Sequence, residues 1–394
     1  MSENSARERT LDIRDLPKVS LHDHLDGGLR PATIIDLAAG AGVSLPASTP
    51  EALGEWFRES ADSGSLERYL ETFAITIGVM QDAASLTRVA REFVEDLIDD
   101  GVVYAEVRWA PEQHTTKDLT MAEAVAAVQD GIDEAVQDAR DADVDIEVGQ
   151  ILSAMRQNTN SFEVAELALQ LRDAGVVGFD LAGPEDGFPA SDHKNALDLL
   201  AANLFPVTLH AGEAAGLLSI QSALVDGRAL RLGHGVRLAE DLSTEEIDGD
   251  DDEAVTIFSA GTVATWVRDR GIALEICPSS NLQTGATAAW ASTLDEHPVD
   301  VLFRTGFNVT ISPDNRLMSG TTLSDELALL VEAFDYDAED LLELTLNAVE
   351  ASFLGLDERR DLAELIADAY EDLIEDADDD DDDDEDEDDA EEQD

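Results

Sequence analysis

The sequence predicts an α/β fold of the parallel (β/α)8 TIM barrel type. Two observations predict it: short runs rich in Val, Ile and Leu alternate with longer helical patterns, and chemically active side chains follow most of these runs. Eight strands, each followed by a helix, indicate a single closed barrel. A doubly wound sheet is the alternative, but it would gather its ligand groups at one switch point. The expected strands are residues 18–24, 102–109, 144–155, 176–182, 205–210, 231–234, 273–277 and 308–312.

Helical patterns fill the gaps between the expected strands, and two insertions interrupt the repeat. Residues 240–253 form an acidic insertion, and residues 41–79 form a mostly helical one between the first two strands. The helical insertion lies on the loop side of the barrel, where it would either cover a pocket as a lid or add packing helices. Its aromatic residues are Trp56, Phe57, Tyr69 and Phe73. The helical patterns include residues 86–98, 122–139, 162–172 and 263–270.

The chain is strongly acidic. Its 394 residues are 44% apolar, enough for a large core, yet 89 acidic residues face only 24 basic ones, a net charge of −65. Residues 375–394 contain 17 of the acidic residues and no basic one, so we expect a disordered tail after a barrel domain of residues 1–374. The barrel alone keeps a net charge of −48. Because phosphate binding needs clustered Lys and Arg, we expect no nucleic-acid partner.

The charge also predicts an environment. Repulsion within such a surface is screened in concentrated salt, since the Debye length falls to about 3 Å at 1 M, and we therefore expect a halophile's cytoplasm. An acidic tail that docks a basic partner is the alternative. The single cysteine, Cys277, excludes an intrachain disulfide, suits a reducing compartment and is expected in the barrel core. Residues 1–16 are polar, and no run of 18 apolar residues occurs, so we expect no membrane partner.

Four of the seven histidines stand at the ends of expected strands. His22 and His24 are two residues apart, so they point to the same face of the first strand, and His210 and His234 end the fifth and sixth strands. Imidazoles with one carboxylate and an open position are typical of catalytic zinc sites. Asp314, after the eighth strand, is the expected carboxylate, although Pro-Asp-Asn is also good turn sequence. The remaining histidines are expected at the surface: His114, His193 and His297.

Two further residues, Glu213 and His234, are expected in the same site as the metal ligands. Glu213 follows His210 by three residues, across a glycine that lets the backbone turn. A carboxyl group that is shielded from water can hold a proton and deliver it in the transition state. His234 would face a metal-bound water as a base or as an electrostatic stabiliser, since zinc lowers the pKa of that water to about 7.

These motifs resemble those of zinc-dependent adenosine deaminases, which belong to the amidohydrolase-type barrels. The resemblance covers nearly the whole chain without its acidic tail, and several motifs in one order are far more specific than any one of them. It rests on PKVSLHDHLDG at residues 17–27, MR at 155–156, DLAG at 180–183, HAGE at 210–213, GHG at 233–235, EICPSSN at 275–281 and SPDN at 312–315.

The resemblance implies a cofactor and a reaction. One zinc ion would be bound by His22, His24, His210 and Asp314. Glu213 would donate a proton to purine N1, and His234 would position the hydroxide that attacks C6. Ammonia would then leave. Adenosine would give inosine and 2′-deoxyadenosine would give 2′-deoxyinosine, a reaction of purine salvage.

The resemblance also implies contacts to the nucleoside. Asp26 would meet the ribose hydroxyls, Gly183 would contact purine N3 through its backbone, and His24 would lie close to the nucleoside. Most family members carry an aspartate that contacts N7 where this chain has Asn315, and an amide can donate to N7 without borrowing a proton. Asp180 is expected either to support a ligand or to end its strand with a hydrogen bond.

Related activities define the alternatives. Enzymes that act on free adenine tend to have Glu where Asp26 stands, and a deaminase of AMP would need basic groups for a phosphate that Asp26 repels. Modified adenosines remain a second alternative. Binuclear amidohydrolases use a modified lysine after strand four, and residues 176–183 contain no lysine, which predicts one metal. The motifs of the cytidine-deaminase zinc site are absent. A non-catalytic acidic binding protein on the same barrel would have lost a ligand or Glu213, and neither is lost.

Overall fold

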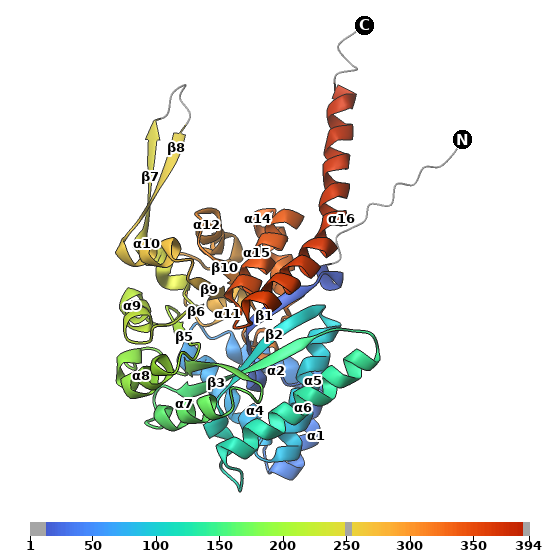
Figure 1. The fold of residues 1–394 in the computed structure, drawn as a ribbon, viewed down its shortest axis with the longest axis vertical. Coiled ribbons are helices and arrows are strands. Elements are labelled where there is room, and N and C mark those ends of the chain that lie inside the picture. The colour runs from blue at the N-terminus through green and yellow to red at the C-terminus, as the bar shows by residue number, and fades with distance from the viewer. Residues whose placement is uncertain (1–12, 249–253, 389–394) are drawn as a thin grey trace, which may run out of the picture.

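The computed structural model describes residues 13–248 and 254–388 of the chain, and its centre is a parallel barrel surrounded by helices (Figure 1). The eight barrel strands match the expected ones, with ends that differ by at most three residues. The (β/α)8 prediction is therefore confirmed. The strands are β1 (Lys18–His24), β2 (Val102–Trp109), β3 (Glu147–Met155), β4 (Val176–Ala182), β5 (Thr208–Ala211), β6 (Arg231–His234), β9 (Ala273–Ile276) and β10 (Val309–Ile311).

Two seams close the barrel. Strands β1 to β4 form one sheet in chain order, and the other sheet has the order β10-β9-β6-β5. A parallel bridge between Phe179 and Val207 joins β4 to β5, and another between Asp23 and Asp314 joins β1 to the end of β10. At the second seam the backbone N–H of His24 donates to the Asp314 carbonyl at 2.8 Å, and the N–H of Asp314 donates to the His22 carbonyl at 3.0 Å. The barrel thus closes at the predicted metal ligands.

Amphipathic helices cover the outside of the barrel. Helix α5 (Ala83–Asp99) shows the pattern: Asp82 caps its first turn by accepting from Ser85 N at 2.9 Å, and its buried face includes Leu86, Val89 and Phe93. The other covering helices are α6 (Met121–Asp141), α7 (Ser161–Gln170), α8 (Lys194–Ala202), α9 (Leu217–Val225), α10 (Thr262–Asp269), α12 (Val299–Arg304), α14 (Leu323–Phe334) and α15 (Ala338–Ala351).

The insertion after β1 is helical, as its pattern predicts. It contains α2 (Pro50–Ala61), α3 (Leu66–Glu71) and α4 (Phe73–Val79), which follow α1 (Pro31–Ala41). Phe57 and Tyr69 are buried in the main hydrophobic cluster, so the insertion packs against the barrel as part of the same core. Two short helices, α11 (Pro278–Gln283) and α13 (Arg316–Ser319), follow β9 and β10 at the carboxyl end of the barrel.

The acidic insertion and the residues that follow it contain an antiparallel hairpin that the sequence analysis did not predict. Strands β7 (Leu242–Asp248) and β8 (Ala254–Ala260) pair with each other and project from the barrel (Figure 1). The sequence of β7, LSTEEID, has three acidic residues and no sustained apolar alternation, which is why its strand character went unpredicted.

The last helix, α16 (Leu356–Asp388), extends away from the barrel (Figure 1). It crosses the boundary expected at residue 374 and takes in residues 375–388 of the predicted tail. Disorder of residues 375–394 stays a prediction, based on repulsion among like charges, and residues 389–394 lie outside the described residues. No helix among the described residues is long and apolar enough to cross a membrane.

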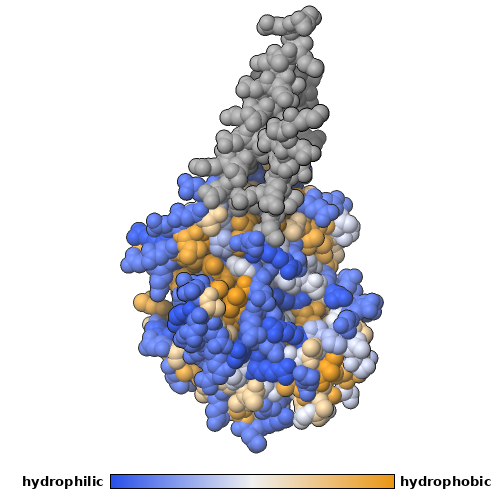
Figure 2. Space-filling model, turned by 90° about the vertical axis from the view of Figure 1, so that its right-hand side faces the viewer, coloured by the Kyte–Doolittle hydropathy of each residue, from blue (hydrophilic) through white to orange (hydrophobic). Residues whose placement is uncertain are grey.

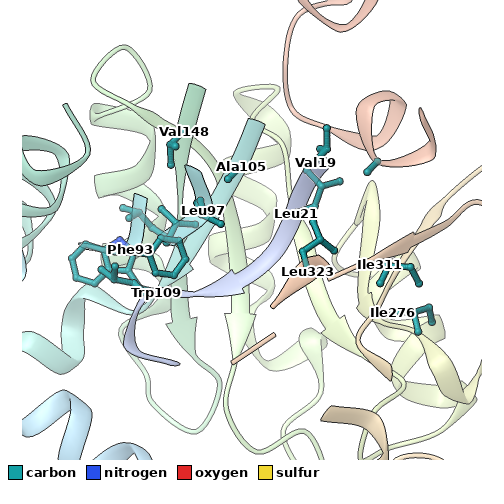
Figure 3. Packing of buried hydrophobic residues seen from close by; sticks show 14 of the residues in the cluster. Val19, Leu21, Phe93, Leu97, Ala105, Trp109, Val148, Ile276, Ile311 and Leu323 are labelled. Carbon is teal, nitrogen blue, oxygen red and sulfur yellow. The ribbon is translucent and has the colours of Figure 1, made fainter. Parts of the chain in front are cut away.

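The core lies between the barrel strands and the surrounding helices. Val19 and Leu21 of β1 pack beside Leu323 of α14, with Ile311 of β10 nearby (Figure 3). Polar and charged side chains cover most of the face shown in Figure 2, with smaller hydrophobic areas between them. Cys277 is fully buried at the end of β9, where it was expected.

The expected surface position of three histidines was wrong, because each has a hydrogen-bond partner inside the fold. His114 is buried with Nδ1 2.9 Å from the Met80 carbonyl. His193 is buried between Ser161 Oγ at 2.8 Å and the Arg156 carbonyl at 3.0 Å. His297 is buried and accepts from a backbone N–H two residues further on, at 3.1 Å. These residues support loops and do not reach the pocket described next.

Candidate active site

A cavity of about 550 Å³ opens at the carboxyl ends of the barrel strands. This size suits a small-molecule ligand. The predicted site residues converge here although they lie up to 293 positions apart in the chain. All of them line the cavity except His22, which is fully buried beside it. The lining set comprises His24, Asp26, Gly183, His210, Glu213, His234, Asp314 and Asn315.

The histidines and the aspartate form a compact cluster. One ligand atom each from His22, His210, His234 and Asp314 lies within 4.8 Å of the others. Asp314 Oδ1 is 3.3 Å from Nε2 of both His22 and His24, and His24 Nε2 is 3.2 Å from His210 Nε2. Imidazole nitrogens that lie this close around a carboxylate need a shared proton or cation between them. The residues present therefore fit a metal ion.

Carboxylates behind the cluster fix the orientation of two imidazoles. Glu275 Oε2 lies 3.0 Å from His22 Nδ1, and Asp180 Oδ1 lies 3.0 Å from His210 Nδ1. Because a carboxylate only accepts, both Nδ1 atoms carry the proton, and the Nε2 lone pairs face the centre of the cluster. This is the tautomer that a ligand needs. The expected supporting role of Asp180 agrees with this geometry.

Glu275 belongs to an ion network inside the barrel. It accepts from Arg108 Nη2 and from Arg231 Nε, each at 2.7 Å, and from Thr208 Oγ1 at 3.0 Å. Burial raises the pKa of Glu275, but the two guanidinium groups outweigh it and hold this pKa well below its usual value. The carboxylate is therefore charged where it meets His22.

Asp314 is held in place from both sides. Its φ of +61° puts it in the left-handed region, which is uncommon for a residue other than glycine and is stabilised here by the backbone pairing with β1. Ser280 Oγ donates to Oδ2 at 2.6 Å, so Oδ1 is left to face the imidazoles. Burial raises the pKa of Asp314, but the neighbouring His22 outweighs it and keeps the carboxylate ionised.

Glu213 is buried and lines the cavity next to His234. Its Oε2 lies 3.6 Å from His234 Nε2. Burial, followed by the charges of Asp314 and Glu185, raises the pKa of Glu213 well above its usual value. The raised pKa favours the protonated form, which is the form that a general acid uses.

His234 differs from the other imidazoles in its partner. Asn281 Nδ2 lies 3.0 Å from His234 Nδ1. With the amide as donor, Nδ1 accepts, and the proton of the neutral ring sits on Nε2, which faces the cavity. Burial lowers the pKa of His234 well below its usual value, so the ring is neutral. His234 thus presents an N–H to the site, whereas His22 and His210 present lone pairs.

The residues expected to meet the nucleoside also line the cavity. Asp26 is buried, and its Oδ1 has no hydrogen-bond partner among the described residues. Gly183 has a φ of +94°, and a Cβ there would come within 2.6 Å of Gln157 Oε1, so only glycine fits at this edge of the cavity. Asn315 packs its Oδ1 against Gly27, where an added Cβ would lie 2.1 Å away.

The helical insertion supplies one wall of the cavity. Helices α3 and α4 contribute Tyr69, Leu70, Phe73 and Ile77 to the lining. These side chains form part of the pocket wall, which is the position that the lid hypothesis requires. Sequence reasoning quoted Arg156, Ser280 and Asn281 within motifs but gave them no role, and it did not single out Glu185.

A parallel barrel with a histidine–aspartate cluster at its carboxyl end defines an amidohydrolase-type barrel enzyme. The chain belongs to the adenosine deaminase family, whose sequence model matches residues 17–369. It is 52% identical to "Adenosine deaminase 1" of Streptomyces coelicolor over 348 residues, which are 88% of this chain and 85% of that protein. It is 48% identical to an adenosine deaminase of Mycobacteroides abscessus, over 89% of this chain and 93% of that protein.

Solved structures support the same family and fold. The structure of the Arabidopsis N6-mAMP deaminase MAPDA matches with a TM-score of 0.73 and 28% identity, over 90% of this chain and 99% of that one. An adenine deaminase from Arthrobacter aurescens matches with a TM-score of 0.75 at 24% identity, over 91% of this chain and 99% of that one, and shows the fold alone.

Proposed function

We propose that this chain catalyses the hydrolysis of adenosine and 2′-deoxyadenosine to inosine and 2′-deoxyinosine, with release of ammonia, in purine salvage. One observation carries the proposal: a buried Glu213, whose pKa is raised by burial, shares a cavity with a cluster of imidazoles around Asp314. Membership of the family and the names of relatives that are about half identical support it.

We propose that one zinc ion is held by His22, His24, His210 and Asp314. His24 is included because its Nε2 faces both Asp314 and His210, at 3.3 and 3.2 Å. His234 is excluded because its Nε2 carries a proton in the geometry described. A zinc ion bound there would lower the pKa of a water molecule towards 7 and so supply a nucleophile at neutral pH.

The residues of the chain then carry the proton steps. Glu213 donates its proton to purine N1, which makes C6 more electrophilic. His234 orients the attacking oxygen and stabilises the charge that develops on it. As the C6–N bond breaks, the amino group takes up one proton of the attacking water and leaves as ammonia, C6 keeps the oxygen, and the other proton of the water restores Glu213. The apolar wall formed by α3 and α4 excludes bulk water from these steps.

The lining favours a nucleoside over a nucleotide. Asp26 offers an unpartnered carboxylate oxygen, which suits the two hydroxyls of a ribose. Among the described residues no lysine or arginine lines the cavity, whereas Glu67 and Glu71 do. A phosphate group on the 5′ carbon would find no cation and three carboxylates, so we propose that AMP is excluded.

Two alternatives follow from the same cavity. Deamination of free adenine or of a modified adenosine would use the same Glu213 and the same metal cluster. A non-catalytic binding role would leave the buried Glu213, with its raised pKa, without a purpose. We also propose a salt-rich cytoplasm as the working environment, because the barrel keeps its net charge of −48 without the tail.

A substrate panel tests the proposal. Release of ammonia from adenosine, 2′-deoxyadenosine, adenine and AMP, and of methylamine from N6-methyl-AMP, is measured in multimolar KCl with zinc-loaded protein, with and without a chelator. We expect turnover of the two nucleosides that the chelator abolishes. Faster turnover of adenine or of a nucleotide would replace the proposed substrate, and no turnover of any of them would reject the deaminase function.

A further inference from the structure

One buried carboxylate holds the loop that carries Glu213. Glu185 is only 3% exposed and accepts backbone hydrogen bonds from the N–H groups of four consecutive residues. Its Oε1 accepts from Gly212 at 2.6 Å, and its Oε2 accepts from Glu213, Ala214 and Ala215 at 3.0, 2.7 and 2.9 Å. The loop therefore wraps its amides around a single anion.

This loop has few other supports for its N–H groups. It lies between the end of β5 at Ala211 and the start of α9 at Leu217, and Gly212 turns the chain with a φ of +80°. On its other side, Arg237 Nη1 donates to the Ala214 carbonyl at 2.8 Å. N–H groups that are buried or partly buried need acceptors, and the Glu185 carboxylate accepts from all four.

Glu185 also joins two parts of the cavity. It follows Gly183 by two residues in the loop after β4, and β4 lies beside β5 in the barrel. The loop after β4 thus contributes Gly183 to the cavity lining, and the loop after β5 contributes Glu213. The Glu185 carboxylate therefore fixes the distance between the two loops, and so between Gly183 and Glu213.

We propose that Glu185 is a positioning residue for the deamination reaction: it fixes the Glu213 loop so that the Glu213 carboxyl group meets purine N1 while Gly183 meets the same base. Its chemistry explains the choice of residue, because both oxygens of a carboxylate only accept. A glutamine would offer one accepting oxygen and an NH2 group that cannot accept from the loop. The inference rests on the proposed function, since it acts through Glu213.

Glu185→Gln in the full-length, zinc-loaded protein tests the proposal. We expect kcat for adenosine to fall about 10- to 100-fold, because misplacement of a catalytic group by about 1 Å has an effect of this size. KM should stay within about threefold, and bound zinc should stay at the wild-type level, because neither the ligands nor Asp26 contacts Glu185. Glu185→Asp keeps the charge on a shorter side chain and should recover part of kcat.

A matched control separates positioning from general stability. Asp241 accepts backbone hydrogen bonds from Val263 and Ala264, each at 2.9 Å, outside the cavity. Asp241→Asn should lower stability and leave kcat per bound zinc unchanged. A double mutant gives the decisive comparison: in a Glu213→Gln background, Glu185→Gln should cause no further loss of kcat, because its effect passes through Glu213.

Three results would overturn the proposal: wild-type kcat in Glu185→Gln, full additivity with Glu213→Gln, or failure of both Glu185 variants to fold with zinc. The last would make the residue a structural support only. Wild-type protein that fails to deaminate adenosine in the same assay would instead reject the proposed function, so the two failures are distinguishable.

Discussion

His210 and Asp180 form a pair in which Nδ1 of the imidazole lies 3.0 Å from the carboxylate, while the backbone N–H of His210 donates to the same oxygen at 3.2 Å. The pair sets both the tautomer and the angle of the ring. We predict that Asp180→Asn weakens zinc binding about 10- to 100-fold, since supporting partners of metal-bound histidines have effects of this size.

Competition with a chelator of known affinity measures that change. Asp198→Asn is the control, because Asp198 pairs with Lys194 and Arg228 at the exposed surface and should leave zinc binding unchanged. Wild-type zinc affinity in Asp180→Asn would remove Asp180 from the metal centre.

Replacing Glu213 separates proton donation from metal binding. Glu213→Gln keeps the size of the side chain but cannot give up a proton to purine N1, so we predict a loss of kcat of about 10²- to 10⁴-fold with zinc content unchanged. Steady-state kinetics and metal analysis of the same samples check both statements. Full activity in this variant would exclude Glu213 from the mechanism.

Glu326 predicts a pH-dependent stability of the fold. It is fully buried on α14 and accepts from Ser279 N at 3.0 Å, and burial raises its pKa from 4.5 to about 7. Between these pH values the folded protein binds the proton more tightly than the unfolded chain. The free energy of unfolding therefore falls as the pH rises from 4.5 to about 7. Above pH 7 the full cost of burying the ionised Glu326 carboxylate remains.

We predict that Glu326→Gln is more stable than the wild type by about 3 kcal/mol at pH 8, and by much less at pH 5. Urea unfolding at the two pH values, in the same KCl concentration, measures the difference. Glu332→Gln, at an exposed position of the same helix, should change stability by less than about 0.5 kcal/mol at either pH. Equal effects of Glu326→Gln at pH 5 and pH 8 would contradict the prediction.

The charge of the chain predicts a salt requirement. We expect the melting temperature to rise with KCl up to multimolar concentrations, because screening removes repulsion within a barrel of net charge −48. Deletion of residues 375–394 should leave kcat for adenosine unchanged and reduce the salt requirement. A truncated protein that does not fold would show that the barrel domain extends beyond residue 374.

The strands and the metal cluster could be predicted because their signals are local. His22 and His24 share one strand, and His210, His234 and Asp314 each end another, so the rule that barrel strands bring their carboxyl ends together was enough. The other three histidines do not end expected strands, so no second set of histidines competed as the metal ligands.

Other features depend on partners that no local pattern reveals. His114 was expected at the surface, yet it bonds to the carbonyl of Met80, 34 residues earlier. Glu185 looks like an ordinary loop carboxylate until the fold brings it to the amides after β5. Glu275 stood in a recognised motif, but its pairing with Arg108 and Arg231 depends on the inward direction of three strands.

The most direct test of the account is the turnover of adenosine by the same protein sample in three states: as zinc-loaded, after removal of the metal by a chelator, and after zinc is restored. In multimolar KCl we predict inosine and ammonia in equal amounts from the first and third states and none from the second. Turnover that persists without metal, or no turnover in the zinc-loaded state, would contradict the central claim.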